Sequence, residues 1–194
     1  MSADGGNINA MFNYAKMLTK GDGIEINKQE AAHYYKMSAD GGNINAMFNY
    51  AKMLIKGDGI EINKQEAARY YRMSADEGNT GAMFDYSEML YNGDGIDINK
   101  QEAARYSKMS ADGGNTNSMF IYGLMLYGGE GIEVNKQEAA HYYKMSADGG
   151  DIEGMKNYGY MLEKGECIEV NKQEAARYYK MSADRGNTVA MCNY

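Results

Sequence analysis

The side chains most suited to catalysis are scarce in this 194-residue chain and lie far apart. Its two histidines, His33 and His141, are three copies apart in a sequence that repeats every 36 residues, and the same repeat position holds arginine elsewhere. Glu30 precedes His33 by three residues, so we expect both side chains on the solvated face of one helix. No nucleophile recurs together with a base and an acid. The sequence therefore predicts that the protein is not an enzyme.

Metal and cofactor sites are not expected either. Cys167 and Cys192 form no C-x-x-C pair and no disulfide framework, which favours a reducing compartment such as the cytoplasm. The recurring Gly-Asp-Gly-Ile-Glu loop clusters Asp22, Glu25 and Asn27, but it lacks the spacing of an EF-hand, and turn formation explains it better. Its Gly-x-Gly follows no predicted strand, which argues against a nucleotide-binding fingerprint. We expect no metal and no cofactor.

Charge and hydropathy point to a protein partner. The formal net charge is −7 and the pI is about 4.9, and no continuous basic stripe is present, so nucleic-acid binding is not expected. No apolar run approaches the roughly 20 residues of a membrane-spanning helix. A protein or a peptide is the remaining class of partner.

The repeat decides the fold. Met-Ser-Ala-Asp recurs at Met1, Met37, Met73, Met109, Met145 and Met181. Self-similarity at this period is typical of a solenoid, in which each repeat packs on its neighbours. We divide residues 1–194 as one array into the units 7–42, 43–78, 79–114, 115–150 and 151–186, with a partial unit at 187–194. Both ends fall inside a repeat, which suggests a segment of a longer array whose ends fray or associate end to end through Met191 and Tyr194.

Each repeat is predicted to form two helices, near 7–19 and 27–39 in the first unit. Asn7 is a candidate cap for a first helix whose apolar positions follow a helical period, and Gly21 is expected to end it with a left-handed residue. Asn27 and Glu30 resemble a capping box at the start of the second helix. We therefore expect an all-α, right-handed α-solenoid of 36-residue helix-turn-helix repeats. Cys167 occupies a loop position that is glycine in the other repeats, and it is strained if that position needs a positive φ.

The motif resembles a known family. In the second unit it comprises Ala46, Tyr50-Ala51, Leu54, Gly57-Asp58-Gly59-Ile60, Ala67, Tyr70-Tyr71, Ala75 and Gly78-Asn79. This spacing resembles the Sel-one-like repeat, a relative of the tetratricopeptide repeat, over the whole chain. Ser107 and Cys167 are among the departures from its pattern. The resemblance implies the solenoid fold and a scaffold or adaptor role in binding other proteins.

The positions that vary between repeats are the candidate binding site. On the first helices they form a stripe opposite the predicted core face, here called the first-helix stripe, and in the related tetratricopeptide fold this stripe lines the concave groove. We predict a groove that is basic at its N-terminal end, aromatic in the middle and mixed beyond. Its peptide-binding residues would be Lys16, Phe48, Lys52, Lys56, Phe84, Glu88, Tyr91, Phe120, Leu124, Tyr127 and Tyr160.

Two interpretations of these residues remain open. All four phenylalanines fall in one column, either as packing between repeats or as a ladder of anchors for a peptide. The lysines are either an ordinary solvated face or a basic patch that favours an acidic flank of the partner. The leading function is a scaffold that binds a peptide or partner domain in the groove. The alternatives are a purely structural array or spacer and, more remotely, a hydrolase, as the resemblance suggests for some secreted members.

Overall fold

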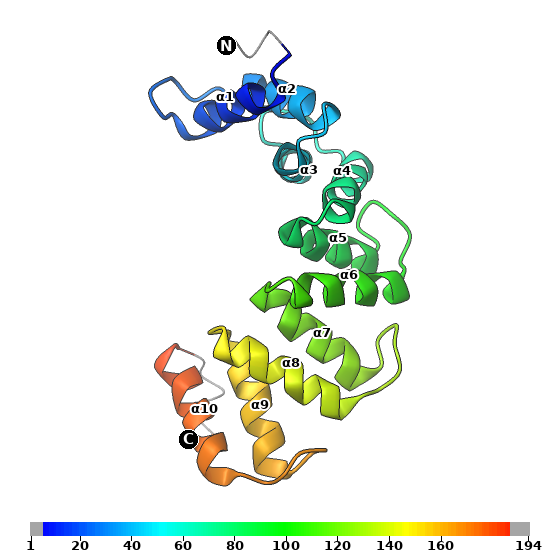
Figure 1. Cartoon of the computed structure of the whole chain (residues 1–194), viewed down its shortest axis with the longest axis vertical. Coiled ribbons are helices and arrows are strands. Elements are labelled where there is room, and N and C mark those ends of the chain that lie inside the picture. Colours follow the sequence, from blue (N-terminus) through cyan, green and yellow to red (C-terminus); the bar gives the residue numbers. More distant parts are fainter. Residues whose placement is uncertain (1–5, 187–194) are drawn as a thin grey trace. The chain divides into compact units, whose positions relative to one another are not determined.

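The computed structural model describes residues 6–186, and within them the chain forms ten α-helices and no strand (Figure 1). The helices are α1 (Ile8–Lys20), α2 (Lys28–Asp40), α3 (Ile44–Lys56), α4 (Lys64–Asp76), α5 (Thr80–Asn92), α6 (Lys100–Asp112), α7 (Thr116–Gly128), α8 (Lys136–Asp148), α9 (Ile152–Lys164) and α10 (Lys172–Asp184). The predicted all-α solenoid is confirmed, with each helix beginning one residue later than expected. The predicted association through Met191 and Tyr194 concerns residues outside the described range.

The chain divides into two compact units at Ile98 and Asn99. Unit 1 holds α1 to α5 and unit 2 holds α6 to α10. Inside each unit a helix packs on the helices next to it in the sequence: α1 on α2, α2 on α3, and so on to α5, and likewise from α6 to α10. This nearest-neighbour packing is the defining property of a repeat solenoid. The prediction that all repeats form one right-handed array stays a prediction.

Asparagine caps both helices of the first repeat. The Asn7 side chain accepts a 2.9 Å hydrogen bond from the backbone N–H of Ala10, and α1 ends at Gly21 in the left-handed conformation, with φ +72°. At the second helix, Asn27 Oδ1 accepts from the Glu30 N–H at 3.1 Å. The capping box differs from expectation in one bond. The Glu30 carboxylate accepts from the Asn27 side chain, and the Asn27 backbone N–H donates instead to the carbonyl of Leu18 at 3.1 Å. The loop is thereby tied to the end of the first helix.

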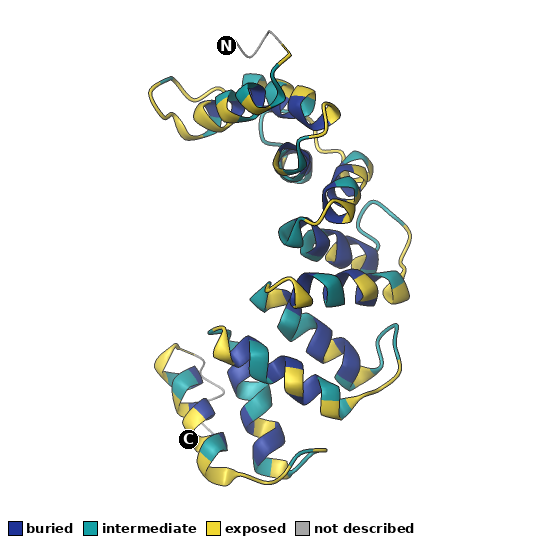
Figure 2. Cartoon of the chain, in the orientation of Figure 1, coloured by how far each residue is buried: buried dark blue, intermediate teal, exposed yellow. Residues whose placement is uncertain are grey.

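The core consists mainly of alanine, tyrosine and methionine side chains. Figure 2 shows buried residues along the packed faces of the helices and exposed residues at the loops. Buried serines link the two helices of a repeat. Ser38 donates from its hydroxyl to the carbonyl of Ile8 at 2.8 Å, and the same bond recurs from Ser74 to Ile44 and from Ser182 to Ile152. Since alanine and serine are small, the helices approach closely, and tyrosine rings pack edge to face between the two helices of a repeat, as Tyr50 and Tyr70 do at 4.9 Å.

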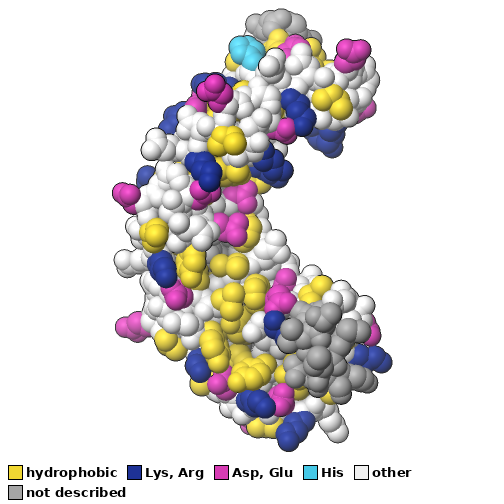
Figure 3. Space-filling model, turned by 180° about the vertical axis from the view of Figure 1, so that it is seen from behind, with side chains coloured by type: hydrophobic (Ala, Val, Ile, Leu, Met, Phe, Trp, Pro, Cys, Tyr) yellow, Lys and Arg dark blue, Asp and Glu magenta, His cyan; other side chains and the backbone are white. Residues whose placement is uncertain are grey.

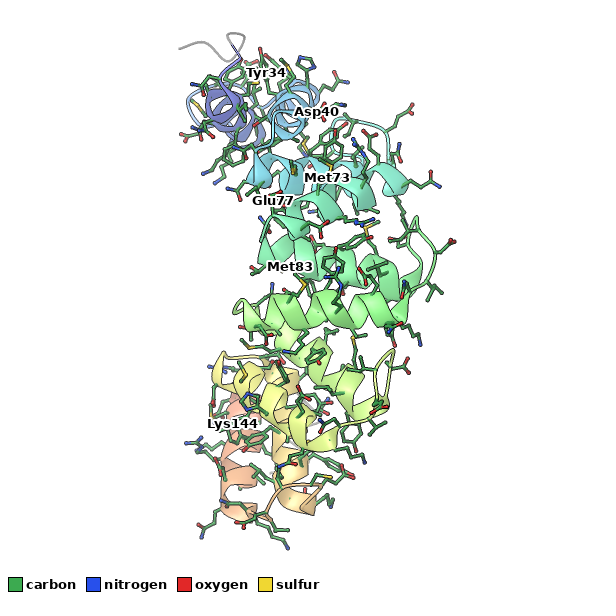
Figure 4. All side chains as sticks on the ribbon, turned by 45° about the vertical axis from the view of Figure 1, so that its right-hand side comes forward. Tyr34, Asp40, Met73, Glu77, Met83 and Lys144 are labelled. Carbon is green, nitrogen blue, oxygen red and sulfur yellow. The ribbon has the colours of Figure 1, made fainter. Side chains whose placement is uncertain are left out.

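A group of three side chains, here called the Asp–Tyr–Lys clamp, joins successive second helices. Asp40 at the end of α2 accepts hydrogen bonds from the Tyr70 hydroxyl on α4 and from Lys36 Nζ at 2.7 Å. The clamp recurs as Asp112–Tyr142–Lys108 and as Asp148–Tyr178–Lys144. Asp40 and Lys144, labelled in Figure 4, belong to the first and the last of these three clamps.

The loop position of Cys167 has a positive φ, as anticipated. Its φ is +59°, and it is the one non-glycine residue among the described part of the chain with a positive φ. The equivalent glycines Gly23 and Gly131 have φ +76° and +78°. Side chains rarely adopt this conformation, so Cys167 is strained.

Candidate functional site

The structure places every predicted site residue on a first helix, and none of them is buried. Unit 1 holds Lys16, Phe48, Lys52, Lys56, Phe84, Glu88 and Tyr91, and unit 2 holds Phe120, Leu124, Tyr127 and Tyr160. Lys16, Lys56, Glu88, Leu124 and Tyr160 are exposed, and the other six are half-buried. The first-helix stripe therefore reaches solvent in every repeat.

The phenylalanine column packs between helices while part of each ring stays accessible. Phe48 lies against Tyr71 of α4 with ring centroids 5.9 Å apart, and Phe120 lies against Tyr143 of α8 at 6.0 Å. Phe48 also reaches the next first helix, because a Cβ placed on Gly81 of α5 would lie 3.1 Å from its Cζ. Packing between repeats thus has direct structural support. The role of these rings as peptide anchors stays a prediction.

Unit 1 contains a pocket of about 350 Å³ between α3, α4 and α5. Its lining residues are Lys52, Ile55 and Lys56 from α3, Tyr71 from α4, Asp85, Glu88, Met89 and Asn92 from α5, and Asp94 from the following loop. This unit 1 pocket brings together three of the predicted site residues, Lys52, Lys56 and Glu88. It does not include Lys16, Phe84 or Tyr91.

Sequence reasoning missed Tyr71 and Asp85 in this pocket. Asp85 is half-buried and forms a hydrogen bond with the Tyr71 hydroxyl. The sequence does distinguish Asp85 from its equivalents. Repeats one, two and five hold an uncharged amide in the same column, at Asn13, Asn49 and Asn157. An acidic residue that replaces an amide on a partly buried face carries a desolvation cost, which makes it a candidate for function.

Burial and like charge shape the electrostatics of the pocket. Burial raises the pKa of the Asp85 carboxyl, although the Tyr71 hydrogen bond and the nearby lysines oppose the shift. The pKa of Glu88 is also raised, first by partial desolvation of its carboxyl group beside the pocket and then by the negative charge of Asp85. Lys52 lies over the Phe48 ring, with its Nζ 5.2 Å from the centroid. Two acids on α5 therefore face a basic α3 across one pocket.

In unit 2 one column of the first-helix stripe is apolar or aromatic where unit 1 has a charge. Leu124 is 38% exposed and Tyr160 is 43% exposed, in the same repeat column that holds Lys16, Lys52 and Glu88 in unit 1. Tyr127 is held in place, because its hydroxyl donates to Glu166 at 2.7 Å and Lys136 Nζ lies 4.5 Å from its ring centroid. Figure 3 shows hydrophobic side chains gathered on the C-terminal half of the face drawn there.

The two histidines lie in different repeats and do not form a site together. His33 and His141 are exposed, and each meets the edge of the adjacent tyrosine, at 5.4 and 5.6 Å between ring centroids. Within residues 6–186, no three histidine, cysteine, aspartate or glutamate side chains lie together in a way that could hold a metal ion. No helix in that range combines the length and the apolar character needed to cross a membrane.

Comparison with known proteins identifies the repeat. The Sel1 repeat family model matches residues 8–43, 44–79, 80–115, 116–151 and 152–187. No curated protein matches the chain. A Sel1 repeat protein from Oxalobacter formigenes is 30% identical, with a TM-score of 0.89 over 96% of this chain and 76% of that one.

Two further structures share the fold. c5321, a protective antigen present in uropathogenic Escherichia coli strains and displaying an SLR fold, is 26% identical with a TM-score of 0.93, and the match covers 97% of this chain but 40% of that one. The Helicobacter pylori cysteine rich protein B is 19% identical with a TM-score of 0.55, over 69% of this chain and 98% of that one, which is evidence for the fold alone. Proteins built from Sel1 repeats are generally protein-interaction scaffolds and generally not enzymes. With five matched copies in succession, the chain belongs to the Sel1 repeat family.

Proposed function

We propose that the protein is a non-enzymatic interaction scaffold that binds a peptide or a partner domain through the first-helix stripe. The observation that carries this proposal is a single repeat column. It holds Lys16, Lys52, Glu88, Leu124 and Tyr160, so its chemistry changes along the array while the buried alanine and tyrosine columns hardly change. Packing of the solenoid does not require such a change at exposed positions, whereas recognition of one defined partner does.

The exposed apolar members of the column support binding to a protein. Leu124 and Tyr160 leave more than a third of their surface in water, and large apolar side chains grouped on a surface mark interaction sites. Tyrosine is also among the residues that most often dominate binding energy, because it buries a rigid apolar ring and offers one hydroxyl. We therefore place the principal apolar anchors in unit 2.

The basic residues of the first-helix stripe suggest an acidic flank on the partner. Lys16 and Lys56 are exposed, and neither forms an ion pair with any other residue in the described range. The whole chain carries a net charge of −7, so these lysines form a local exception that would attract an acidic segment and increase its association rate.

A purely structural array is the second candidate. It is favoured by the near-identity of residues 1–36 and 37–72, which differ at three positions. Recent duplication can produce such copies without any selection for binding. The later repeats carry the differences on which the binding proposal depends, so they are the part of the chain to test.

The test is a peptide display selection on the purified protein, followed by affinity measurements on an enriched peptide. The double variant Leu124→Lys/Tyr160→Lys places in unit 2 the residue that the same column holds in repeats one and two, so the fold should tolerate it. We expect affinity to fall at least tenfold. The matched control is Val134→Lys/Val170→Lys, which changes two loop residues that are 59% and 58% exposed and lie outside the stripe. The proposal fails if no peptide is enriched, or if the stripe variant binds as well as the control.

A further inference from the structure

Asp85 and Glu88 carry negative charge that the protein itself leaves without a cation in contact. Neither carboxylate forms an ion pair within residues 6–186, whereas other acids there do, such as Asp58 with Lys28 at 2.5 Å and Asp112 with Lys108 at 2.7 Å. A carboxylate has room for about four hydrogen bonds, and the Tyr71 hydroxyl supplies one to Asp85. Both side chains line the unit 1 pocket.

The fold does not need these two charges. Repeats one, two and five build the same helix with asparagine in the Asp85 column, and repeats one and two have lysine in the Glu88 column. In the third repeat the two acids are neighbours on one helix face, at positions i and i+3, where like charges repel. The burial of Asp85 adds a desolvation cost. Lys52 and Lys56 offset part of this cost from across the pocket, and a ligand cation between the two acids would offset more of it.

We propose that the unit 1 pocket receives a lysine or arginine side chain of the partner segment, with its cation between Asp85 and Glu88. The apolar stem of that side chain would lie along Met89 and Ile55, which line the same pocket. A volume of about 350 Å³ is within the range of sites that bury a small ligand. This inference rests on the proposed scaffold function and names the chemistry of its partner.

The opposite wall of the pocket favours an acidic residue next to the basic residue of the partner. Lys52 and Lys56 on α3 line the side across from α5, so an acidic side chain of the same segment would contact them. The partner segment would therefore carry an acidic residue close to its basic one. A uniformly acidic segment would place a negative charge against Asp85 and be rejected.

The experiment is a double-mutant cycle on peptides enriched from a randomised display library on the wild-type protein. We expect enriched peptides to contain a lysine or arginine close to an aspartate or glutamate. Replacing that basic residue with glutamine should weaken binding to the wild-type protein about tenfold or more. The same glutamine substitution in the peptide should hardly change its affinity for Asp85→Asn, because the substitution in the peptide and the one in the protein remove the same interaction. Asp85→Asn introduces the amide that the second repeat has at Asn49. The variant is folded if its circular dichroism spectrum matches that of the wild type and its urea midpoint is equal to or higher than that of the wild type.

The matched control is Ser87→Ala on the same helix, which installs the alanine found at Ala51 and does not line the pocket. Replacing the basic residue of the peptide with glutamine should weaken binding to Ser87→Ala as much as it weakens binding to the wild type. The inference is overturned if enriched peptides bind through the first-helix stripe without a basic residue, or if glutamine weakens binding equally on wild type and Asp85→Asn; the scaffold function then still stands. If no peptide is enriched at all, both the inference and the scaffold function fail.

Discussion

The hydroxyl of Tyr142 donates a 2.8 Å hydrogen bond to the carboxylate of Asp112, which joins the second helices of two successive repeats. Lys108 donates to the same carboxylate at 2.7 Å. Each repeat of a solenoid contacts only its neighbours, so a link of this kind acts directly on the interface energy that holds the array together. Because the clamp recurs, a change in one copy can be compared with the others inside one molecule.

Removing the clamp hydroxyl should loosen the interface. We expect Tyr142→Phe to lower the free energy of unfolding by about 1–3 kcal/mol, because the hydroxyl donates to Asp112 and accepts from Lys108 Nζ at 3.2 Å, and both partners are charged. The Tyr142 ring is buried, so phenylalanine keeps the packing and the effect reports on the hydroxyl. A urea titration monitored by circular dichroism measures it. Tyr160→Phe, on an exposed ring, is the control and should leave the midpoint unchanged.

The clamp also predicts a loss of stability in acid. Burial opposes ionisation of Asp112, but hydrogen bonds from Lys108 and Tyr142 outweigh it and hold the pKa of this carboxyl below its usual range. The folded protein therefore binds the proton more weakly than the unfolded chain does. The stabilisation is complete above the ordinary aspartate pKa of about 4 and is lost as the pH falls through the lower pKa of the folded state.

The measurement is the urea midpoint as a function of pH between 2 and 7. The wild type should lose stability below about pH 4. Asp112→Asn should be less stable at neutral pH and show a shallower acid loss. An acid loss that is identical in the two proteins would show that the clamp does not contribute to it.

Asp85 should behave in the opposite way. Burial raises the pKa of its carboxyl, so the folded state binds the proton more tightly than the unfolded chain, and stability falls as the pH rises through this raised pKa. The cost is complete at neutral pH. We therefore expect Asp85→Asn to unfold at a higher urea concentration than wild type at pH 7, with the difference disappearing below about pH 4. Asp22→Asn, in an exposed loop, should show no such gain, and a lower midpoint for Asp85→Asn would contradict the prediction.

The fold was predictable from the sequence because each of its determinants is local and occurs five times. Asn7, Gly21 and Asn27 mark helix ends through bonds to residues close in the chain. Only some of the residues that line the unit 1 pocket could be predicted from the sequence. Lys52 and Glu88 stood out as variable positions, but Tyr71 belongs to a column that is tyrosine in most repeats, and nothing in its own segment indicates that it hydrogen-bonds a residue of the next repeat. Which residues share a pocket depends on how helices from two repeats pack, and local sequence does not encode that.

The same limit applies to the phenylalanine column. The helical period places Phe48 on the stripe opposite the core face, but it does not show that the ring packs on Tyr71 and reaches the next first helix. The contact with the next first helix depends on Gly81, which has no side chain and lets Phe48 reach α5. Packing and ligand contact are therefore not exclusive for this ring. The fully buried tyrosines, by contrast, were assignable from the repeat alone.

The strained loop of the fifth repeat offers a matched series of three variants. Cys167 has φ +59°, a conformation that costs a side chain roughly 1–2 kcal/mol relative to glycine. Cys167→Gly should therefore raise the free energy of unfolding by about 1 kcal/mol, reduced slightly by the greater entropy of glycine in the unfolded chain. The reverse change at Gly23 should cost a similar amount, because its φ is +76° and a Cβ there would meet no atom within 4 Å.

A comparison of Gly131 with Gly23 distinguishes backbone strain from steric conflict. The φ of Gly131 is +78°, but a Cβ on it would lie 2.2 Å from the carbonyl oxygen of Lys100, far inside van der Waals contact, so the backbone must move as well. Gly131→Cys should therefore destabilise the protein clearly more than Gly23→Cys. Urea midpoints in the presence of a reductant measure all three, since the reductant prevents new disulfides. If Cys167→Gly lowers the midpoint, or if the two glycine variants cost the same, then positive φ and the approach of Lys100 are not what restricts this loop position to glycine.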